Sequence, residues 1–244
     1  QGTLSTAIGY AAGQTSQGDS AVAVGNTAGE TSQGTGSVAI GQLSGNTGQL
    51  GFATSVGYGS GQTTQGVGCA AIGFNAGSNT QGTSAVAVGN SAGQNNQGIN
   101  SVAVGKQAGQ TTQGASSVAV GYFAGLTSQG ENAVAVGNQA GETTQGENSV
   151  AVGNTAGETS QGLNGLAIGF GSGKLNQGVN GTSFGQNAGQ TNQGQQSVAI
   201  GTVSGKDDQG TFAVSIGPTS GKTSQGSQSI AIGNLAAEIS QGGT

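Results

Sequence analysis

Histidine, methionine and tryptophan are absent from this sequence, and its 244 residues include one cysteine and one proline. Without histidine, the chain cannot form the usual catalytic triads or the common zinc sites. Charged residues make up only 5% of the chain, with four Lys and Arg against nine Asp and Glu, so the sequence lacks the basic surface that nucleic acids require. No apolar run of about 18 residues occurs either, and we expect no insertion into a membrane.

Glycine is abundant instead, with 53 residues. Collagen is excluded because glycine does not fall at every third position and proline is nearly absent. Glutamine supplies the period: it recurs every 16 residues from Gln1 to Gln241 without insertion or deletion, which gives fifteen repeats and a four-residue remainder. Repeat positions are numbered below from this glutamine, so that Gln1 occupies position 1.

Residues 145–160, QGENSVAVGNTAGETS, illustrate the repeat. Glycine occupies position 9 in every repeat, position 2 except at Leu50, and position 13 except at Ala237, which indicates corners of the backbone. Positions 5–8 alternate small and β-branched residues, as strands do, and positions 14 to 1 form a second, more polar strand.

The pattern predicts an all-β fold, a single-domain β-solenoid or β-roll of fifteen 16-residue coils that runs without a boundary over residues 1–244. Since the chain starts at Gln1 and not at methionine, we expect a processed product or a piece of a longer fibre.

The repeated glutamine is expected to be structural. In a solenoid, identical positions stack, and a side-chain amide can both donate and accept hydrogen bonds from turn to turn. A ligand site would need only a few turns, whereas this residue never varies. The predicted ladder includes Gln17, Gln33, Gln65, Gln81, Gln97, Gln113, Gln129, Gln145 and Gln161.

Small residues fill positions 5 and 7 of the first strand; position 7 is alanine or serine throughout. Large aliphatic residues at positions 6 and 8 point to the other side. Because a solvent face would drift among larger polar residues, the small side predicts a close lateral contact with other copies, as a trimer or a bundle. The expected interface residues are Ala87, Ala103, Ala119, Ala135 and Ala151.

The pentapeptides SVAIG and SVAVG occur at residues 37–41, 101–105, 117–121, 149–153 and 197–201. They resemble the head repeat of trimeric autotransporter adhesins, and similar repeats occur in surface or fibre proteins of large DNA viruses. The resemblance implies a trimeric β-roll in a structural fibre or adhesin head, located outside the cell, on the cell surface or on a virion. The repeat is longer here and has an added Gln-Gly corner, so the family's anchoring mechanism is not carried over.

Catalytic and metal-binding constellations are not apparent. Cys69 replaces the usual serine or alanine at position 5 and is expected to be a small core or interface residue. Glu131 and Glu147 stack at position 3, and Glu158 lies one turn from Lys174, which favours a solvated face with paired charges over a cation site. We therefore expect neither an enzyme nor a cofactor.

Aromatic residues collect at position 10, just after the invariant glycine. They could contact sugars or a neighbouring fibre, or they could simply cover the corner. A glycan or protein on a host surface is the candidate partner besides the chain itself. The candidate ligand contacts are Tyr10, Tyr58, Phe74, Tyr122 and Phe170.

Ice binding is the alternative function, because position 15 is threonine in ten of fifteen repeats and regular threonine arrays occur in ice-binding solenoids. Strict alternation, however, places this threonine on the same face as the invariant glutamine, which we expect to be the inner face. A single threonine row also falls short of the paired rows that such proteins present.

Overall fold

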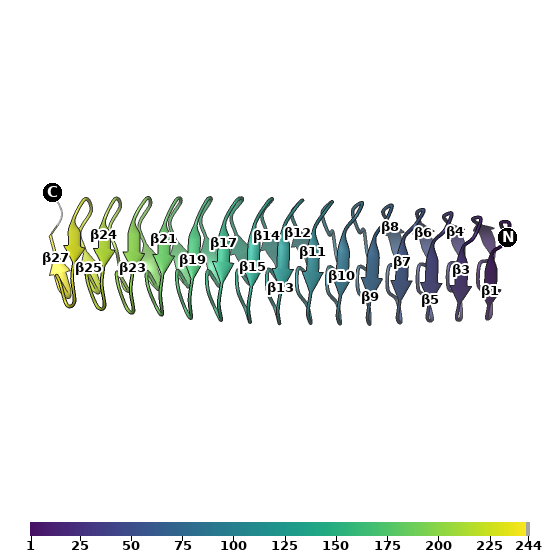
Figure 1. The fold of residues 1–244 in the computed structure, drawn as a ribbon, viewed down its shortest axis with the longest axis horizontal. Helices are drawn as coiled ribbons and strands as arrows, with labels where there is room; N and C mark the ends of the chain where they lie inside the picture. The colour runs from purple at the N-terminus through teal and green to yellow at the C-terminus, as the bar shows by residue number, and fades with distance from the viewer. Residues whose placement is uncertain (243–244) are drawn as a thin grey trace. The chain divides into compact units, whose positions relative to one another are not determined.

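The computed structural model describes residues 1–242, which form two compact units, Gln1–Phe123 and the part of the chain from Ala124 onward. Each unit is a β-solenoid that makes one turn per 16-residue repeat (Figure 1). The described residues contain no helix, and therefore none long and apolar enough to cross a membrane. The predicted all-β parallel solenoid is confirmed.

One strand of each turn covers positions 6–8, and these strands form what we call the first sheet. In the first unit they are β1 (Thr6–Ile8), β3 (Val22–Val24), β5 (Val38–Ile40), β7 (Thr54–Val56), β9 (Ala70–Ile72), β10 (Val86–Val88), β11 (Val102–Val104) and β13 (Val118–Val120). In the second unit they are β15 (Val134–Val136), β17 (Val150–Val152), β19 (Leu166–Ile168), β21 (Thr182–Phe184), β23 (Val198–Ile200), β24 (Val214–Ile216) and β26 (Ile230–Ile232).

The second sheet takes the strands that end on the repeated glutamine. In the first unit they are β2 (Thr15–Gln17), β4 (Thr31–Gln33), β6 (Thr47–Gln49), β8 (Thr63–Gln65) and β12 (Thr112–Gln113). In the second unit they are β14 (Ser128–Gln129), β16 (Thr144–Gln145), β18 (Thr159–Gln161), β20 (Leu175–Gln177), β22 (Thr191–Gln193), β25 (Thr223–Gln225) and β27 (Ile239–Gln241). Single bridges, such as Gln65 with Gln81, continue the pairing where strands are interrupted.

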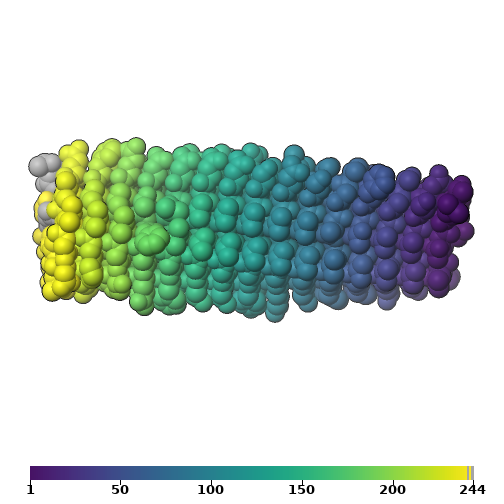
Figure 2. Space-filling view, viewed as in Figure 1, coloured from purple at the N-terminus to yellow at the C-terminus, as the bar shows by residue number. Residues whose placement is uncertain are grey.

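Pairing within each sheet is parallel and shifted by one repeat. Val86 pairs with Val102, and Ala87 with Ala103. Each repeat position therefore forms a straight row within its unit, and the turns follow one another as parallel bands on the surface in Figure 2.

The invariant glycine at position 9 is required by the close approach of successive turns. Gly89 has a φ of 129°, and a Cβ atom on it would lie 2.6 Å from the carbonyl oxygen of Gly105. Any side chain here would both strain the backbone and collide with the next turn. This explains why no repeat departs from glycine at this corner.

The interior of each turn is narrow and holds only small side chains plus the repeated glutamine. Alanines at positions 5, 7 and 12 are completely buried, as Ala85, Ala87 and Ala92 show. A Cβ atom on Gly141 would lie 2.8 Å from Gln145 Oε1 and 3.4 Å from Ala135 Cβ, so no room remains for larger residues.

The predicted interface of small residues is therefore wrong in its placement. Each of the five alanines has 0% exposed surface, so none can meet another copy; they are Ala87, Ala103, Ala119, Ala135 and Ala151. The physical reason is the short turn: two sheets linked by so few residues lie too close together for valine or isoleucine to fit between them. The large aliphatic residues face outward instead.

The expected inward position of the threonine row at position 15 is also wrong. Thr15, Thr47 and Thr63 are exposed, although the glutamines two positions later are buried. In most turns the backbone at position 16 enters the left-handed region, with a φ of 58° at Ser16. This local reversal breaks the alternation, so threonine and glutamine lie on opposite faces of the second sheet.

Candidate binding surfaces

The glutamine row lies inside the solenoid. The nine glutamines of the predicted ladder are each at most 4% exposed, and the amide of Gln33 donates to Val22 O at 2.7 Å. Amides also bond from turn to turn: Gln49 Nε2 donates to Gln65 Oε1, and Gln65 Nε2 to Gln81 Oε1, both at 3.0 Å. The bond to the position-6 carbonyl recurs along both units, for example from Gln97 to Val86 O and from Gln161 to Val150 O. This row joins the two sheets and presents nothing to a ligand.

Replacing a ladder glutamine should destabilise the protein. Gln193 Nε2 donates to Thr182 O at 2.8 Å, and its Oε1 accepts from Gln177 Nε2 at 3.0 Å. We expect Gln193→Leu to lower the free energy of unfolding by about 1–3 kcal/mol, because buried partners lose their hydrogen bonds. Urea denaturation followed by circular dichroism measures this. The matched control is Gln195→Leu, two residues away on the exposed corner, and equal stability of the two variants would contradict the prediction.

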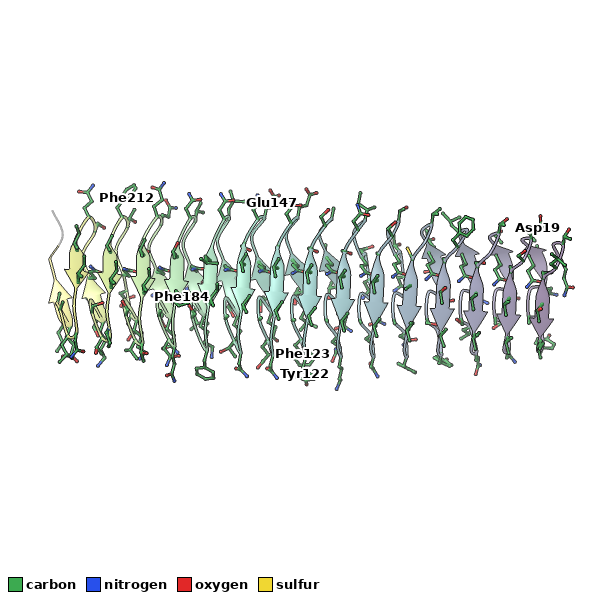
Figure 3. The ribbon with its side chains drawn as sticks, in the orientation of Figure 1. Asp19, Tyr122, Phe123, Glu147, Phe184 and Phe212 are labelled. Carbon is green, nitrogen blue, oxygen red and sulfur yellow. The ribbon has the colours of Figure 1, made fainter. Side chains whose placement is uncertain are left out.

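The outward side of the first sheet forms an apolar surface, which we call the outer aliphatic face; it comprises positions 6 and 8. Apart from Thr6, Thr54 and Thr182, every residue at these positions is apolar. Ile40 and Ile72 are 40% and 43% exposed. In the second unit, Phe184 is 52% exposed and projects from β21 in Figure 3. No residue of this face is charged.

The position-10 aromatics lie on an exposed corner next to the first sheet. In the first unit, Tyr58 and Phe74 stack, with ring centroids 5.3 Å apart and an interplanar angle of 10°. Tyr122 stacks instead on Phe123, at 4.0 Å, and Lys106 Nζ lies 5.5 Å from the Tyr122 centroid. Of the five candidate contacts, the structure thus brings together only Tyr58 and Phe74. Tyr10 is 79% exposed and Phe170 is 54% exposed.

Sequence reasoning missed Phe123 and Lys106, because it considered only the aromatic residues at position 10. The signal was present in the adjacent letters Tyr122-Phe123 and in Lys106 one turn earlier at position 10. In Figure 3, Tyr122 and Phe123 lie at the edge opposite Asp19 within the first unit. The aromatic corner and the corner at positions 3 and 4 are therefore two separate surfaces.

Charges are sparse, and two of the three ion pairs within residues 1–242 join neighbouring turns. Lys174 Nζ lies 3.3 Å from Glu158 Oε2, as the spacing of the sequence predicted, and Lys222 Nζ lies 3.4 Å from Glu238 Oε1. Such exposed pairs contribute at most about 1 kcal/mol each. Within residues 1–242, no three or more acidic, cysteine or histidine side chains gather as a metal site would require.

Cys69 is 2% exposed and packs against Ala53 and Ala85. Burial raises the pKa of its thiol above the ordinary value, which disfavours the reactive thiolate. The cysteine therefore acts as a small core residue, and it is not placed to serve as a nucleophile.

Comparison with known families finds two copies of the YadA head domain repeat, at residues 97–124 and 128–156. Both segments contain the pentapeptide SVAVG or AVAVG on a strand of the first sheet. A search of curated proteins finds no significant match. The head-repeat resemblance predicted from the pentapeptides is confirmed for these two segments.

Proposed function

Taking as premise that the chain carries YadA head repeats, we propose that the protein is a non-catalytic adhesin-type head or fibre segment on a cell or virion surface. Copies associate through the outer aliphatic face, as a homotrimer, and present the remaining surfaces to a partner. The observation that carries this proposal is the continuous apolar surface at positions 6 and 8 in each unit, beside a head repeat of a trimeric adhesin family.

A second copy of the chain is the occupant that suits this face best. Every turn presents the same two outward positions, so one copy offers another a surface with the same spacing and the same lack of charge. Valine and isoleucine each contribute about 1.5–3 kcal/mol when fully buried, and the face repeats this gain along the sheet. Strands covered on both sides are typically rich in β-branched residues, as the first sheet is.

Continuity of the chain as one solenoid domain over residues 1–244 is part of the proposal. The repeat keeps its length across the border between Phe123 and Ala124, and the second head repeat begins only a few residues after that border. A rigid repetitive stalk or head gives many identical turns from which to display a contact site.

Ice binding remains the second candidate because the threonine row faces outward. Two observations weigh against it. Asn79 and Asn95 interrupt the row in the first unit, and Leu175 and Asp207 interrupt it in the second. Lys206 pairs with Asp207 at 3.4 Å, which adds charge to the same surface. An ordered array is thus limited to short stretches. Faceted ice growth at micromolar protein would reverse this ranking.

The surface location can be tested by labelling. Antibodies against the purified chain should decorate intact cells or particles of the source without permeabilisation, because an adhesin-type head must reach its partner outside. The control is an antibody against an internal protein of the same source. Labelling that appears only after permeabilisation would contradict the proposal.

A further inference from the structure

We infer that the aromatic corner of the first unit, formed by Tyr58 and Phe74 with the amides of Gln42 and Asn90 on the neighbouring turns, binds a neutral polysaccharide. The inference rests on the proposed adhesin function and names the chemistry of its partner. These four residues occupy position 10 of four consecutive turns, so they form one row.

The rings are not needed to shape the corner. Gly57, before Tyr58, and Gly89, before Asn90, both have a φ of 129°. The backbone bonds are the same as well: Tyr58 O accepts from Asn75 N at 2.8 Å, and Asn90 O accepts from Gln107 N at 2.8 Å. Since asparagine supports the same corner as tyrosine, covering the backbone does not account for an aromatic residue here.

The ring pair is exposed although it is large and apolar. Tyr58 is 45% exposed and Phe74 50%, and the two rings stack on each other and leave their outer sides to solvent. Gly59 follows Tyr58 and has no side chain, and the amide of Asn75 lies against it. No side chain of Gly59 covers the ring pair, so an extended ligand can reach the rings.

Chemistry at this corner fits a neutral sugar chain. Between residues 41 and 93, positions 9 to 13 of the turns contain no charged residue. Aromatic rings pack against the C–H faces of a pyranose, and amides both donate to and accept from its hydroxyls. An anionic ligand would find no cation next to the pair, and an apolar ligand would leave the amides unpaired.

A second aromatic pair extends the same row. Tyr122 lies three turns beyond Phe74, on the order of 14 Å along a sheet with a strand spacing of about 4.8 Å. Between them, Asn90 and Lys106 occupy position 10. A polysaccharide that runs along the row can contact both pairs, whereas a monosaccharide can reach only one. Longer chains should accordingly bind more tightly than short ones.

Affinity electrophoresis in native gels tests the inference with dextran, laminarin and galactomannan as neutral probes and alginate as an acidic one. We expect at least one neutral polysaccharide to retard the protein. The double variant Tyr58→Ala with Phe74→Ala should weaken retardation by about tenfold or more, because both stacking surfaces are lost. The matched control is Phe52→Ala, an exposed phenylalanine of the same turn at the opposite corner, which should bind like the parent protein.

Tyrosine emission gives a second readout, since the chain has three tyrosines and no tryptophan. Titration with the retarding polysaccharide should change the emission, and Tyr58→Phe should keep binding while reducing that change. Retardation by alginate alone, no retardation by any neutral probe, or equal retardation of the double variant would overturn the inference. The oligomeric state is measured on the same samples. If no polysaccharide binds but the oligomer is intact, the sugar inference fails and the proposed adhesin-type function does not.

Discussion

Ala103→Glu is expected to unfold the protein or to lower its free energy of unfolding by about 3–5 kcal/mol, the cost of a buried charge without a partner. Ala103 is completely buried, and it pairs with Ala87 and Ala119 on the adjacent strands. The interior at this position has no space for a glutamate side chain and no cation to pair with its carboxylate. Urea denaturation followed by circular dichroism measures the loss.

The control for this variant is the next residue. Val104→Glu places the same charge on the outer aliphatic face, because side chains alternate along β11. The isolated solenoid should then keep its secondary structure. If Ala103→Glu were as stable as Val104→Glu, the assignment of inner and outer faces would be reversed.

Val88→Glu combined with Val104→Glu is expected to dissociate the oligomer and leave folded monomers. The two valines occupy position 8 on the adjacent strands β10 and β11, so two carboxylates would face a partner surface that has no compensating charge. Sedimentation velocity separates the species, and circular dichroism confirms that the monomer is folded.

A matched pair on the second sheet controls for added charge. Asn95→Glu combined with Thr111→Glu changes position 15 in the same two turns, where both residues face outward away from the first sheet. This variant should remain oligomeric. Dissociation of both double variants would show that charge alone, and not the outer aliphatic face, controls association.

The sequence alone predicted the turns and their register, and the reason is physical. A strict 16-residue period allows one way of stacking identical positions, and the glycine corners fix where the chain bends. The ion pair of Glu158 with Lys174 followed directly from that register.

Which side of the first strand faces inward could not be predicted from its pattern. Hydrophobicity favours burying Val102 and Val104 over Ala103, and this preference usually decides. Here the distance between the two sheets determines which side of the strand faces inward. The distance between the sheets is set by the length of the corners and by the one glutamine side chain per turn that spans the interior. The alternation of residues along the first strand carries no information about this distance.

The outward orientation of the position-15 threonines depends on the backbone φ angle at position 16, which strict alternation does not take into account. Position 16 takes serine, asparagine, aspartate, glycine or threonine, which are residue types that enter the left-handed region or bond to nearby backbone groups. Ser32, with a φ of 58°, is an example. The residue types at position 16 could therefore have indicated a break in the alternation, but the prediction assumed strict alternation.

Sedimentation equilibrium of the unmodified protein at micromolar concentration tests most directly whether the outer aliphatic face joins copies of the chain. We expect a trimer of three 23.0 kDa chains, about 69 kDa. A single species of 23.0 kDa would contradict it.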